Sequence, residues 1–281
     1  MKSVVQLSII TINFNNAVGL QKTMESVFNQ TDTTIEYIVI DGGSNDGSKE
    51  YIEKHATKLR YWISETDKGI YNAMNKGIVK AKGTYLLFLN SGDYLADTNV
   101  IKNIIKYLKL GIDILYGNLL LGEEKQIMKF PEKLKFSYLH NNFLPHPSSF
   151  FKKSLFKKGF MYNEKYKISS DWEFFICNIC KYNSSYKYID YTITVFDLTG
   201  ISSNIKFKEI MRLERHEILK EHFPLFADDF KEFNLLNNLF QRNQFKILKE
   251  LQRSKSAKRI SSLILKILFF LFRGKTPKSL N

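Results

Sequence analysis

The chain has 281 residues, of which 44% are hydrophobic and 14% aromatic, and this composition excludes an intrinsically disordered protein. Its two cysteines, Cys177 and Cys180, are too few for a disulfide framework and suit a reducing compartment. The formal net charge is +14, but residues 241–281 hold 11 Lys or Arg and one acidic residue, so this tail carries 11 − 1 = +10 and the rest only 14 − 10 = +4. The excess charge therefore lies in a tail rather than on a face of the body, and we expect no nucleic-acid partner.

The first hundred residues alternate between strand and helix patterns. Short and nearly continuous apolar runs predict strands at 7–12, 35–40, 59–64 and 85–89. The segments between them predict helices, which begin after Asn16, near Ser48 and at Ile70. This alternation favours a parallel sheet that is covered by helices on both faces.

From residue 99 onward the pattern is less regular. It predicts a helix at 101–110, a strand at 113–116, a helix after Ser170 and a strand at 186–196. Beyond Ser202 every segment is rich in Lys, Glu, Leu and Phe at helical spacing. We therefore divide the chain into residues 1–98, 99–204 and 205–281.

Three acidic residues, Asp41, Asp67 and Asp93, follow successive predicted strands. In a parallel sheet all three would lie at the edge where ligands usually bind. One interpretation is a nucleotide-sugar pocket with a divalent metal, because Mg²⁺ and Mn²⁺ prefer carboxylates and phosphates as ligands. The alternative is that Asp and Gly form turns and helix caps.

Four motifs in this part of the chain resemble the opening of family-2 glycosyltransferases. They are Ser8–Asn16, Tyr37–Ser48, Ser64–Gly77 and Gly83–Asp93, and they occur in the family's order. The resemblance continues more weakly to roughly residue 200, and the last part of the chain lies outside it. It implies a GT-A fold, an α/β unit with a mostly parallel central sheet flanked by helices, followed here by a helical C-terminal extension.

The resemblance also implies a donor site for a UDP- or dTDP-sugar in residues 1–98 and an acceptor site in residues 99–204. Phe14 would stack on the base, Asp41 would accept a hydrogen bond from it, and Lys68 would lie near the phosphates. The full set of nucleotide-binding residues that it implies is Thr11, Asn13, Phe14, Asn15, Asp41, Asp67, Lys68 and Gly69.

The metal motif departs from the family pattern. Relatives often have Asp-x-Asp-Asp where this chain has Asn90-Ser91-Gly92-Asp93, so only Asp93 can bind Mn²⁺ or Mg²⁺ as an anion. We expect a divalent metal with a reduced ligand set. The missing aspartates also leave open an inactive protein that binds nucleotide-sugars.

The expected catalytic base is Asp171, at the start of a helix that resembles the family's base motif. An acceptor hydroxyl needs a carboxylate to take its proton, and backside attack with a single base inverts the anomeric carbon. The same aspartate could instead cap the helix, and Glu173 is the second candidate for the base. His146 and Trp172 are expected near the acceptor or the phosphates, although both residue types are more often structural.

Two further chemistries lack support in the sequence. The turn after the first predicted strand, Asn13 to Asn16, has no G-x-G-x-x-G for a dinucleotide cofactor. Cys177 and Cys180 are separated by two residues, but no further zinc ligands occur at a suitable spacing, so we expect them to pack in the core.

The C-terminal tail contains an apolar helical face flanked by basic residues. Its apolar residues are Ile260, Leu263, Ile264, Ile267, Leu268 and Leu271, and its basic flanks include Lys255, Lys258, Arg259, Arg273, Lys275 and Lys278. The run is shorter than the roughly 18 apolar residues of a membrane span, and the N-terminus has no secretion signal. We expect a cytoplasmic protein on the inner face of the membrane, with an anionic surface and a glycan or lipid-linked acceptor as partners. The alternative is that this helix packs on the protein itself or on a second copy in a homo-oligomer.

Overall fold

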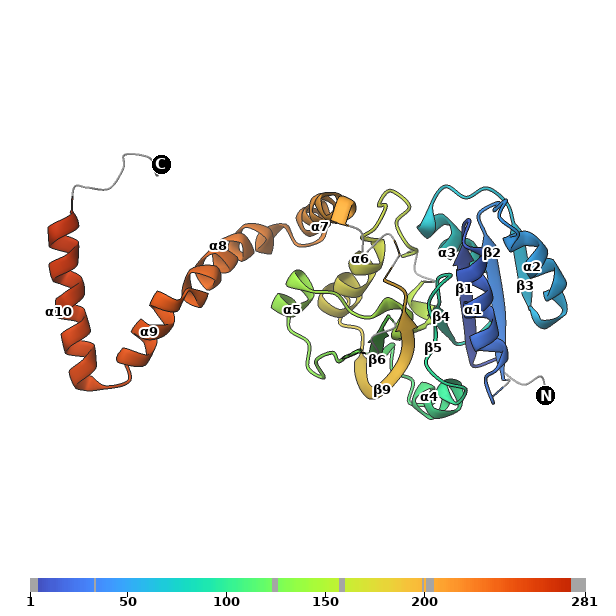
Figure 1. The fold of residues 1–281 in the computed structure, drawn as a ribbon, viewed down its shortest axis with the longest axis horizontal. Coiled ribbons are helices and arrows are strands. Elements are labelled where there is room, and N and C mark those ends of the chain that lie inside the picture. Colours follow the sequence, from blue (N-terminus) through green and yellow to red (C-terminus); the bar gives the residue numbers. More distant parts are fainter. Residues whose placement is uncertain are drawn as a thin grey trace. The chain divides into compact units, whose positions relative to one another are not determined.

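The computed structural model describes residues 5–32, 34–122, 126–156, 160–198, 200 and 205–273 (Figure 1). The chain forms two compact units, Met1–Ile218 and Leu219–Asn281. The boundary that we predicted at residue 205 is earlier than this division, which places the first part of α7 in the first unit. The predicted halves 1–98 and 99–204 share one continuous sheet, so their separation stays a prediction.

The first unit alternates strands and helices through its N-terminal part, as the sequence predicts. In chain order its elements are β1 (Leu7–Asn13), α1 (Ala17–Phe28), β2 (Ile35–Asp41), α2 (Ser48–Lys54), β3 (Tyr61–Ser64), α3 (Ile70–Lys80), β4 (Tyr85–Phe88), β5 (Tyr94–Leu95), α4 (Val100–Leu108), β6 (Ile114–Leu121), β7 (Gln126–Met128), α5 (Phe136–Asn141), β8 (Ser149–Lys152), α6 (Ser170–Ile176), β9 (Tyr186–Phe196) and α7 (Lys208–His222), the last of which continues into the second unit.

The strands of the first unit form a single sheet. Its order is β3-β2-β1-β4-β8-β6-β9-β5, and β7 pairs with β6. The strands β3, β2, β1 and β4 are parallel, whereas β8 runs antiparallel to both β4 and β6, and β6 and β9 are parallel again. The fold class is therefore the predicted α/β sheet with flanking helices, parallel in its first half and mixed in its second.

The order of the first four strands creates a reversal between β1 and β4. Successive strands add on one side of β1 as far as β3, and the chain then returns to place β4 on the other side. In open α/β sheets, ligands bind beyond the carboxyl ends of the strands at such a reversal. The loops that follow β1, β2, β3 and β4 therefore form the expected ligand-binding edge.

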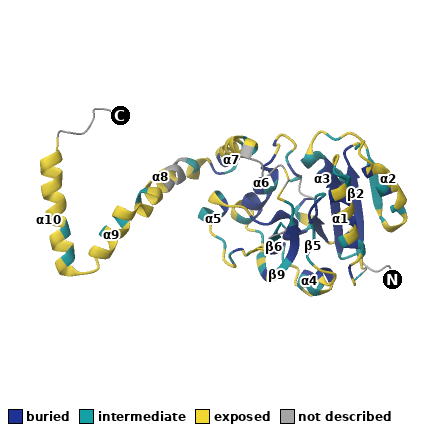
Figure 2. Cartoon of the chain, in the orientation of Figure 1, coloured by how far each residue is buried: buried dark blue, intermediate teal, exposed yellow. Residues whose placement is uncertain are grey.

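Helices cover both faces of the parallel strands, which explains why those strands are apolar on both sides. One core cluster joins the strand residues Leu7, Ile9 and Val39 to α1, α2 and α4. On the opposite face α3 packs closely: a Cβ added at Gly77 would lie 2.5 Å from Cγ2 of Ile10. Only glycine fits at that contact. Figure 2 shows the strands buried between these layers.

The second unit contains the end of α7 and the predicted C-terminal helices α8 (Pro224–Gln241), α9 (Asn243–Leu251) and α10 (Lys255–Phe272). Neither α9 nor α10 has a buried residue, as Figure 2 shows by their colour. Among the described residues, no helix is both long enough and apolar enough to cross a membrane. Lys275 and Lys278, two of the predicted basic flanks, lie outside the described residues.

Candidate active site

Asp41 ends β2 and organises the loop that follows it. The carboxylate is fully buried and accepts four hydrogen bonds, from Nδ2 of Asn13 (2.7 Å), the backbone N–H of Ser44 (2.9 Å) and the hydroxyls of Ser44 and Ser64 (2.6 Å each). Burial alone would raise the pKa of Asp41, but these hydrogen bonds outweigh it and lower the pKa below its usual value. All four acceptor positions of the carboxylate are therefore used inside the protein.

The segment after β1 contains both buried and accessible residues. Thr11 is buried and its hydroxyl bonds to Oη of Tyr37 (2.9 Å), whereas Asn13 is buried between Asp41 and the hydroxyl of Ser91. Phe14 is different, because 67% of its side chain is exposed. Of these three residues, only Phe14 presents a side chain to a ligand.

Asn15 has a positive φ of 49° and stabilises the neighbouring loop. Its backbone N–H donates to the hydroxyl of Ser44 (2.8 Å), and its Oδ1 accepts from the backbone of Asn45 (3.0 Å). Asn is one of the few residues that tolerate this left-handed conformation. Asn15 thus joins the β1–α1 and β2–α2 loops beside the exposed ring of Phe14.

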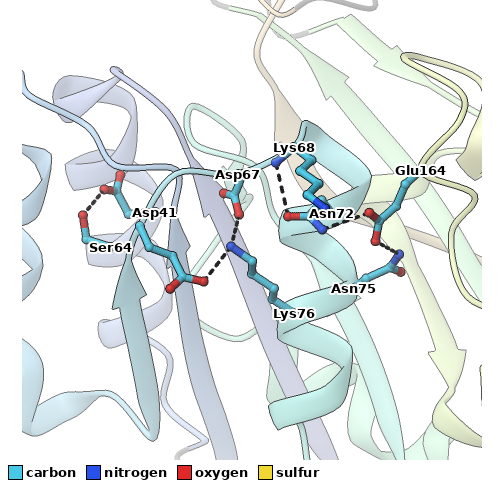
Figure 3. A network of polar contacts seen from close by, with 9 residues as sticks. Asp41, Ser64, Asp67, Lys68, Asn72, Asn75, Lys76 and Glu164 are labelled. Carbon is cyan, nitrogen blue, oxygen red and sulfur yellow. Dashed lines mark hydrogen bonds and ion pairs between the residues drawn. The ribbon is translucent and has the colours of Figure 1, made fainter.

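Asp67 follows β3 and forms an ion pair with Lys76 of α3. Nζ of Lys76 lies 2.5 Å from Oδ1 of Asp67 (Figure 3). It also lies 2.7 Å from Oε1 of Glu65. Burial raises the pKa of Asp67, and the cation only partly offsets this. A Cβ added at Gly42 would lie 3.1 Å from Phe14 and 3.2 Å from Asp67, so the exposed ring and this carboxylate flank the same glycine.

Two of the predicted nucleotide-binding residues, Lys68 and Gly69, lie between Asp67 and α3. Lys68 is exposed, and its backbone N–H donates to Oδ1 of Asn72 (3.3 Å; Figure 3). Gly69 has φ of 126°, a conformation that side chains rarely adopt, and directly precedes α3. The Lys68 cation is therefore available to a ligand beside Asp67.

An open cavity of about 430 Å³ lies near this ion pair. Its lining combines Glu65 and Lys76 with the amides of Asn72 and Asn75 and the carboxylate of Glu164. Tyr61, Ile63, Val79 and Lys80 complete the lining. Because neither Asp41 nor Asp171 lines this cavity, we do not identify it with the site of the chemistry.

Asp93 follows β4 and is almost completely buried, with 3% of its surface exposed. Its Oδ1 accepts from the backbone N–H of Asp197 (2.9 Å), the residue that follows β9. Burial, together with the neighbouring charge of Asp197, raises the pKa of Asp93 to about 7. A Cβ added at Gly92 would lie 2.3 Å from Oδ2 of Asp197, so the second carboxylate lies against this loop.

The oxygen atoms around Asp93 suit a hard divalent cation. Oδ1 of Asn90 is buried and has no hydrogen-bond partner within the described part of the chain. That amide oxygen and the carboxylates of Asp93 and Asp197 belong to one loop pair, and Mg²⁺ and Mn²⁺ commonly bind one or two carboxylates plus substrate phosphates. In the described ranges no three His, Cys, Asp or Glu side chains form a complete metal cluster. The residues fit a metal that depends on the substrate for its remaining ligands.

Asp171 lies in the first turn of α6 and contacts α3. Its Oδ1 accepts a hydrogen bond from Oη of Tyr71 (3.0 Å) and one from the backbone N–H of Trp172 (2.8 Å). Tyr71 is buried and lies two residues after Gly69. The carboxylate of Asp171 is therefore bonded to the helix that directly follows the predicted nucleotide-binding residues Lys68 and Gly69.

Further contacts fix α3 against the segment between β8 and α6. Asn75 bonds to both backbone groups of Tyr162, with its Oδ1 accepting (3.1 Å) and its Nδ2 donating (2.8 Å). Asn72 and Asn75 each donate to the carboxylate of Glu164 at 2.9 Å (Figure 3). These bonds hold the predicted donor and acceptor halves in one arrangement.

His146 lies beneath this contact, buried among the rings of Phe88, Phe151 and Tyr162. Its Nε2 is 2.7 Å from Oη of Tyr162, and burial lowers the pKa of the imidazole although Asp171 opposes the shift. The structure therefore places His146 as a neutral core residue behind the site. Its predicted proximity to phosphate stays a prediction.

Trp172 and Glu173 point away from the solvent. The indole of Trp172 is 5% exposed, its Nε1 donates to the carbonyl of Leu139 (2.7 Å), and the guanidinium of Arg215 covers one face of the ring. Glu173, the second candidate for the base, is also buried. Of the two candidates, only Asp171 is partly exposed at the start of α6.

The three strand-end acids share the predicted edge but do not form one cluster. Asn13 links the loops after β2 and β4, because it bonds to Asp41 on one side and to Ser91 on the other. Asp67 approaches Phe14, whereas Asp93 contacts Asp197. The edge therefore contains two centres, one around Phe14 and Asp67 and one around Asp93.

Comparison with known proteins now identifies the family. Residues 8–160 match the model of glycosyl transferase family 2, and an uncharacterised glycosyltransferase of Mycobacterium tuberculosis is 35% identical over 261 residues, which cover 87% of this chain and 98% of that protein. The chain belongs to glycosyl transferase family 2. A second relative, the GalNAc(5)-diNAcBac-PP-undecaprenol β-1,3-glucosyltransferase of Campylobacter jejuni, is 28% identical and covers 57% of this chain and 56% of that protein.

Solved structures confirm the GT-A fold of this glycosyltransferase. Residues 1–349 of TarS from Staphylococcus aureus, in complex with UDP-GlcNAc, align with a TM-score of 0.62 at 18% identity, over 78% of this chain and 67% of that one. The mannosyltransferase PcManGT from Pyrobaculum calidifontis, in complex with GDP-Man and Mn²⁺, aligns with a TM-score of 0.54 at 12% identity, over 92% and 87% of the two chains.

Several residues that contact the predicted site residues were not identified from the sequence. Tyr71 and Lys76 lie inside a matched motif, but nothing in the motif indicates which carboxylate each one contacts. Asp197 follows a predicted strand just as Asp41 and Asp93 do, so the same strand-end pattern could have revealed it. Arg215 belongs to α7, which the sequence presents only as a charged helix.

Proposed function

We propose that this glycosyltransferase is an inverting enzyme that transfers a sugar from a UDP- or dTDP-sugar to an acceptor hydroxyl, with Asp171 as the general base. The observation that carries the proposal is the hydrogen bond from Tyr71 to Asp171. It holds a partly exposed carboxylate beside the start of α3, where Lys68 and Gly69 precede the helix. A base must lie within reach of the proton that it removes.

In this proposal the nucleobase of the nucleotide-sugar stacks on Phe14, the exposed ring next to Asp67. Aromatic stacking on a base contributes about 1–3 kcal/mol. Asp41 has no unused acceptor position, so a direct hydrogen bond from the nucleobase of the donor requires the hydroxyl of Ser44 or Ser64 to turn away. Otherwise Asp41 acts by shaping the loop that positions Phe14.

The chemistry follows from these positions. The carboxylate of Asp171 takes the proton of the acceptor hydroxyl while that oxygen attacks the anomeric carbon from the face opposite the diphosphate. The bond between the anomeric carbon and the diphosphate oxygen breaks, and the nucleoside diphosphate leaves with the electron pair. Lys68 is placed to offset part of the charge that develops on the leaving group.

We assign Asp93, with Asp197 and Oδ1 of Asn90, as the residues that would hold Mn²⁺ or Mg²⁺. The bound ion would neutralise negative charge on the diphosphate. The support is the buried oxygen of Asn90, which has no hydrogen-bond partner in the described part of the chain and belongs to the same loop as Asp93, together with the Mn²⁺ in the complex of PcManGT.

We further propose a lipid-linked or polysaccharide acceptor and attachment to an anionic membrane surface through α10. The apolar residues of α10 are exposed, among them Leu263 (61%) and Phe270 (77%), and Lys258 and Arg273 lie near its two ends. Interfacial helices bind by burying such residues while basic groups contact lipid phosphates. The relative from Campylobacter jejuni, whose name includes an undecaprenol-linked acceptor, supports this acceptor class.

A screen of nucleotide-sugars tests the donor assignment. We expect UDP- or dTDP-sugars with Mn²⁺ to raise the melting temperature by several degrees at saturation, since a ligand at 100 times its Kd adds about 2.7 kcal/mol. The donor should also be slowly hydrolysed.

Phe14→Ala should weaken donor binding, whereas Val18→Ala, which truncates another exposed residue, should not. Stabilisation by GDP-sugars alone would contradict the assignment, and binding without hydrolysis or transfer would indicate an inactive scaffold.

A further inference from the structure

Arg215 of α7 lies beside the proposed base with most of its hydrogen-bonding capacity unused. Its Cζ is 4.9 Å from the centre of the Trp172 ring, a cation–π contact. Nη1 makes one long hydrogen bond to the carbonyl of Asn142 (3.5 Å), and Nε is buried without a partner in the described part of the chain. A guanidinium has five N–H donors, so most of them are not satisfied by the protein.

Three of the four acidic residues of the same helix have other partners. Glu209 binds Arg212, Glu217 binds Lys165, and Glu214 accepts hydrogen bonds from backbone N–H groups. No carboxylate among the described residues forms an ion pair with Arg215. Burial lowers the pKa of Arg215, and the nearby charge of Asp171 opposes this shift without forming an ion pair, which favours a site that an anionic ligand completes.

Glu214 fixes the position of this cation. Its carboxylate accepts from the backbone N–H groups of Lys167 (2.6 Å), Ile168 (3.1 Å) and Ser169 (3.0 Å), the three residues that lead into α6. Because Asp171 is only two residues further along the chain, these bonds hold α7 against the start of α6, the helix that carries the proposed base. Arg215 is thus a positioned group rather than a freely moving surface arginine.

The surroundings of Arg215 belong to the acceptor side. Trp172 is in α6 and Asn142 follows α5, and both lie within the predicted acceptor half. Lys68, which is predicted near the donor phosphates, and Gly69, which is predicted to bind the nucleotide, precede α3 instead. Planar guanidinium groups bind phosphate oxygens through two parallel hydrogen bonds, a geometry that lysine cannot provide.

We propose that Arg215, stacked on Trp172, binds a phosphate or diphosphate group of the acceptor. The inference rests on the proposed function, because it takes Asp171 to mark the acceptor side. It adds that the acceptor is an anionic, phosphate-linked molecule and names the residue that recognises it. Arg215 is a binding residue in this account and does not contact the reacting hydroxyl.

The test uses the full-length protein with Mn²⁺ and a saturating concentration of UDP, which occupies the donor site. Geranyl diphosphate is the probe, and geraniol is the matched compound without phosphate. We expect the wild type to bind geranyl diphosphate and not geraniol, and Arg215→Ala to lose at least tenfold in affinity for the diphosphate. Arg215→Lys keeps the charge and should recover only part of that loss. Arg212→Ala, which removes an exposed arginine from the same helix, should bind like the wild type.

The affinity of the variants for UDP shows whether Arg215 binds the diphosphate of the donor or that of the acceptor. We expect Arg215→Ala and Arg215→Lys to bind UDP as the wild type does. If Arg215→Ala weakens UDP instead, the guanidinium serves the donor and the inference is wrong. If the affinity for neither UDP nor geranyl diphosphate changes in an Arg215→Ala variant that keeps the wild-type circular dichroism, Arg215 only packs on Trp172, and the inference is again wrong.

Should the alanine substitution prevent folding, the affinities of Arg215→Lys decide the question. A wild type that binds neither UDP nor dTDP would contradict the proposed function itself, whereas a wild type that binds one of them but not geranyl diphosphate would contradict only this inference.

Discussion

Asp93 combines an unfavourable environment with a proposed role in metal binding. Its pKa of about 7 means that the carboxyl group stays mostly protonated in the folded protein up to about pH 7. Between about pH 4 and pH 7 the unfolded chain releases a proton that the folded chain retains, so this residue lowers stability as the pH rises and the loss is complete above about pH 7. Bound Mn²⁺ would favour the ionised form again.

We therefore expect Asp93→Asn to stabilise the metal-free protein at pH 8, by roughly 1–4 kcal/mol, and to change stability little at pH 4. Oδ1 of the asparagine can still accept the hydrogen bond from Asp197. The same variant should lose the increase in stability that Mn²⁺ and UDP give to the wild type. Urea unfolding at both pH values measures this, with the exposed Glu132→Gln as the control. Equal destabilisation at both pH values would show that the carboxylate has favourable contacts and that our account of Asp93 is wrong.

Individual residues differ in how far the sequence alone could specify them. The motif around Asp171 predicts a carboxylate at the start of a helix, and the structure places it there. The motifs around Thr11 and Asp41 also predict positions near the ligand edge, but both side chains are buried and bonded within the protein. The pattern of strands predicts which residues lie at the ligand-binding edge of the sheet. The orientation of each side chain, in contrast, depends on distant partners such as Ser64 and Tyr37.

At the level of elements, the strands and helices with long apolar patterns could be predicted. β1, β2 and β4 begin and end within one residue of the predicted bounds, and the helices α1, α3 and α6 begin within one residue of the predicted starts. The short elements β5, β7 and α5 were not predicted, because each has six residues or fewer and forms only through pairing or packing with distant segments. The antiparallel insertion of β8 was missed for the same reason.

The helix α10 carries the most direct test at this level. We expect full-length protein to float with vesicles that contain anionic lipid, and a protein that ends at Arg253 to remain in solution. Leu268→Asp places a charge among the exposed apolar residues and should also abolish flotation, whereas Lys266→Gln should weaken it only modestly, because one basic residue contributes about 1 kcal/mol.

High salt should reduce the flotation of the full-length protein, because screening weakens the contribution of the basic residues. If neither the full-length nor the shortened protein floats, attachment through α10 is wrong. A full-length protein that is dimeric while the shortened one is monomeric would then assign the exposed residues of α10 to contact with a second copy.

On the scale of the whole molecule, one continuous sheet joins the donor and acceptor parts of the site. The chain reverses between β1 and β4, continues through β8 and β6, and ends the sheet with β9, whose last residue precedes Asp197. The sequence predicted the first half of this arrangement from its regular alternation. It could not predict that β9 would bring a second carboxylate to Asp93, because this contact joins residues 104 positions apart.

The central claim is that Asp171 removes the acceptor proton, and the turnover of Asp171→Asn tests it most directly. With a donor and acceptor that the wild type uses, we expect turnover to fall at least about 100-fold while the Kd for the donor changes less than about threefold, because the amide keeps the shape but cannot take a proton. Glu173→Gln and the surface control Asp190→Asn should retain transfer, and the wild-type product should have the inverted anomeric configuration. Turnover of Asp171→Asn within about threefold of the wild type would contradict the account.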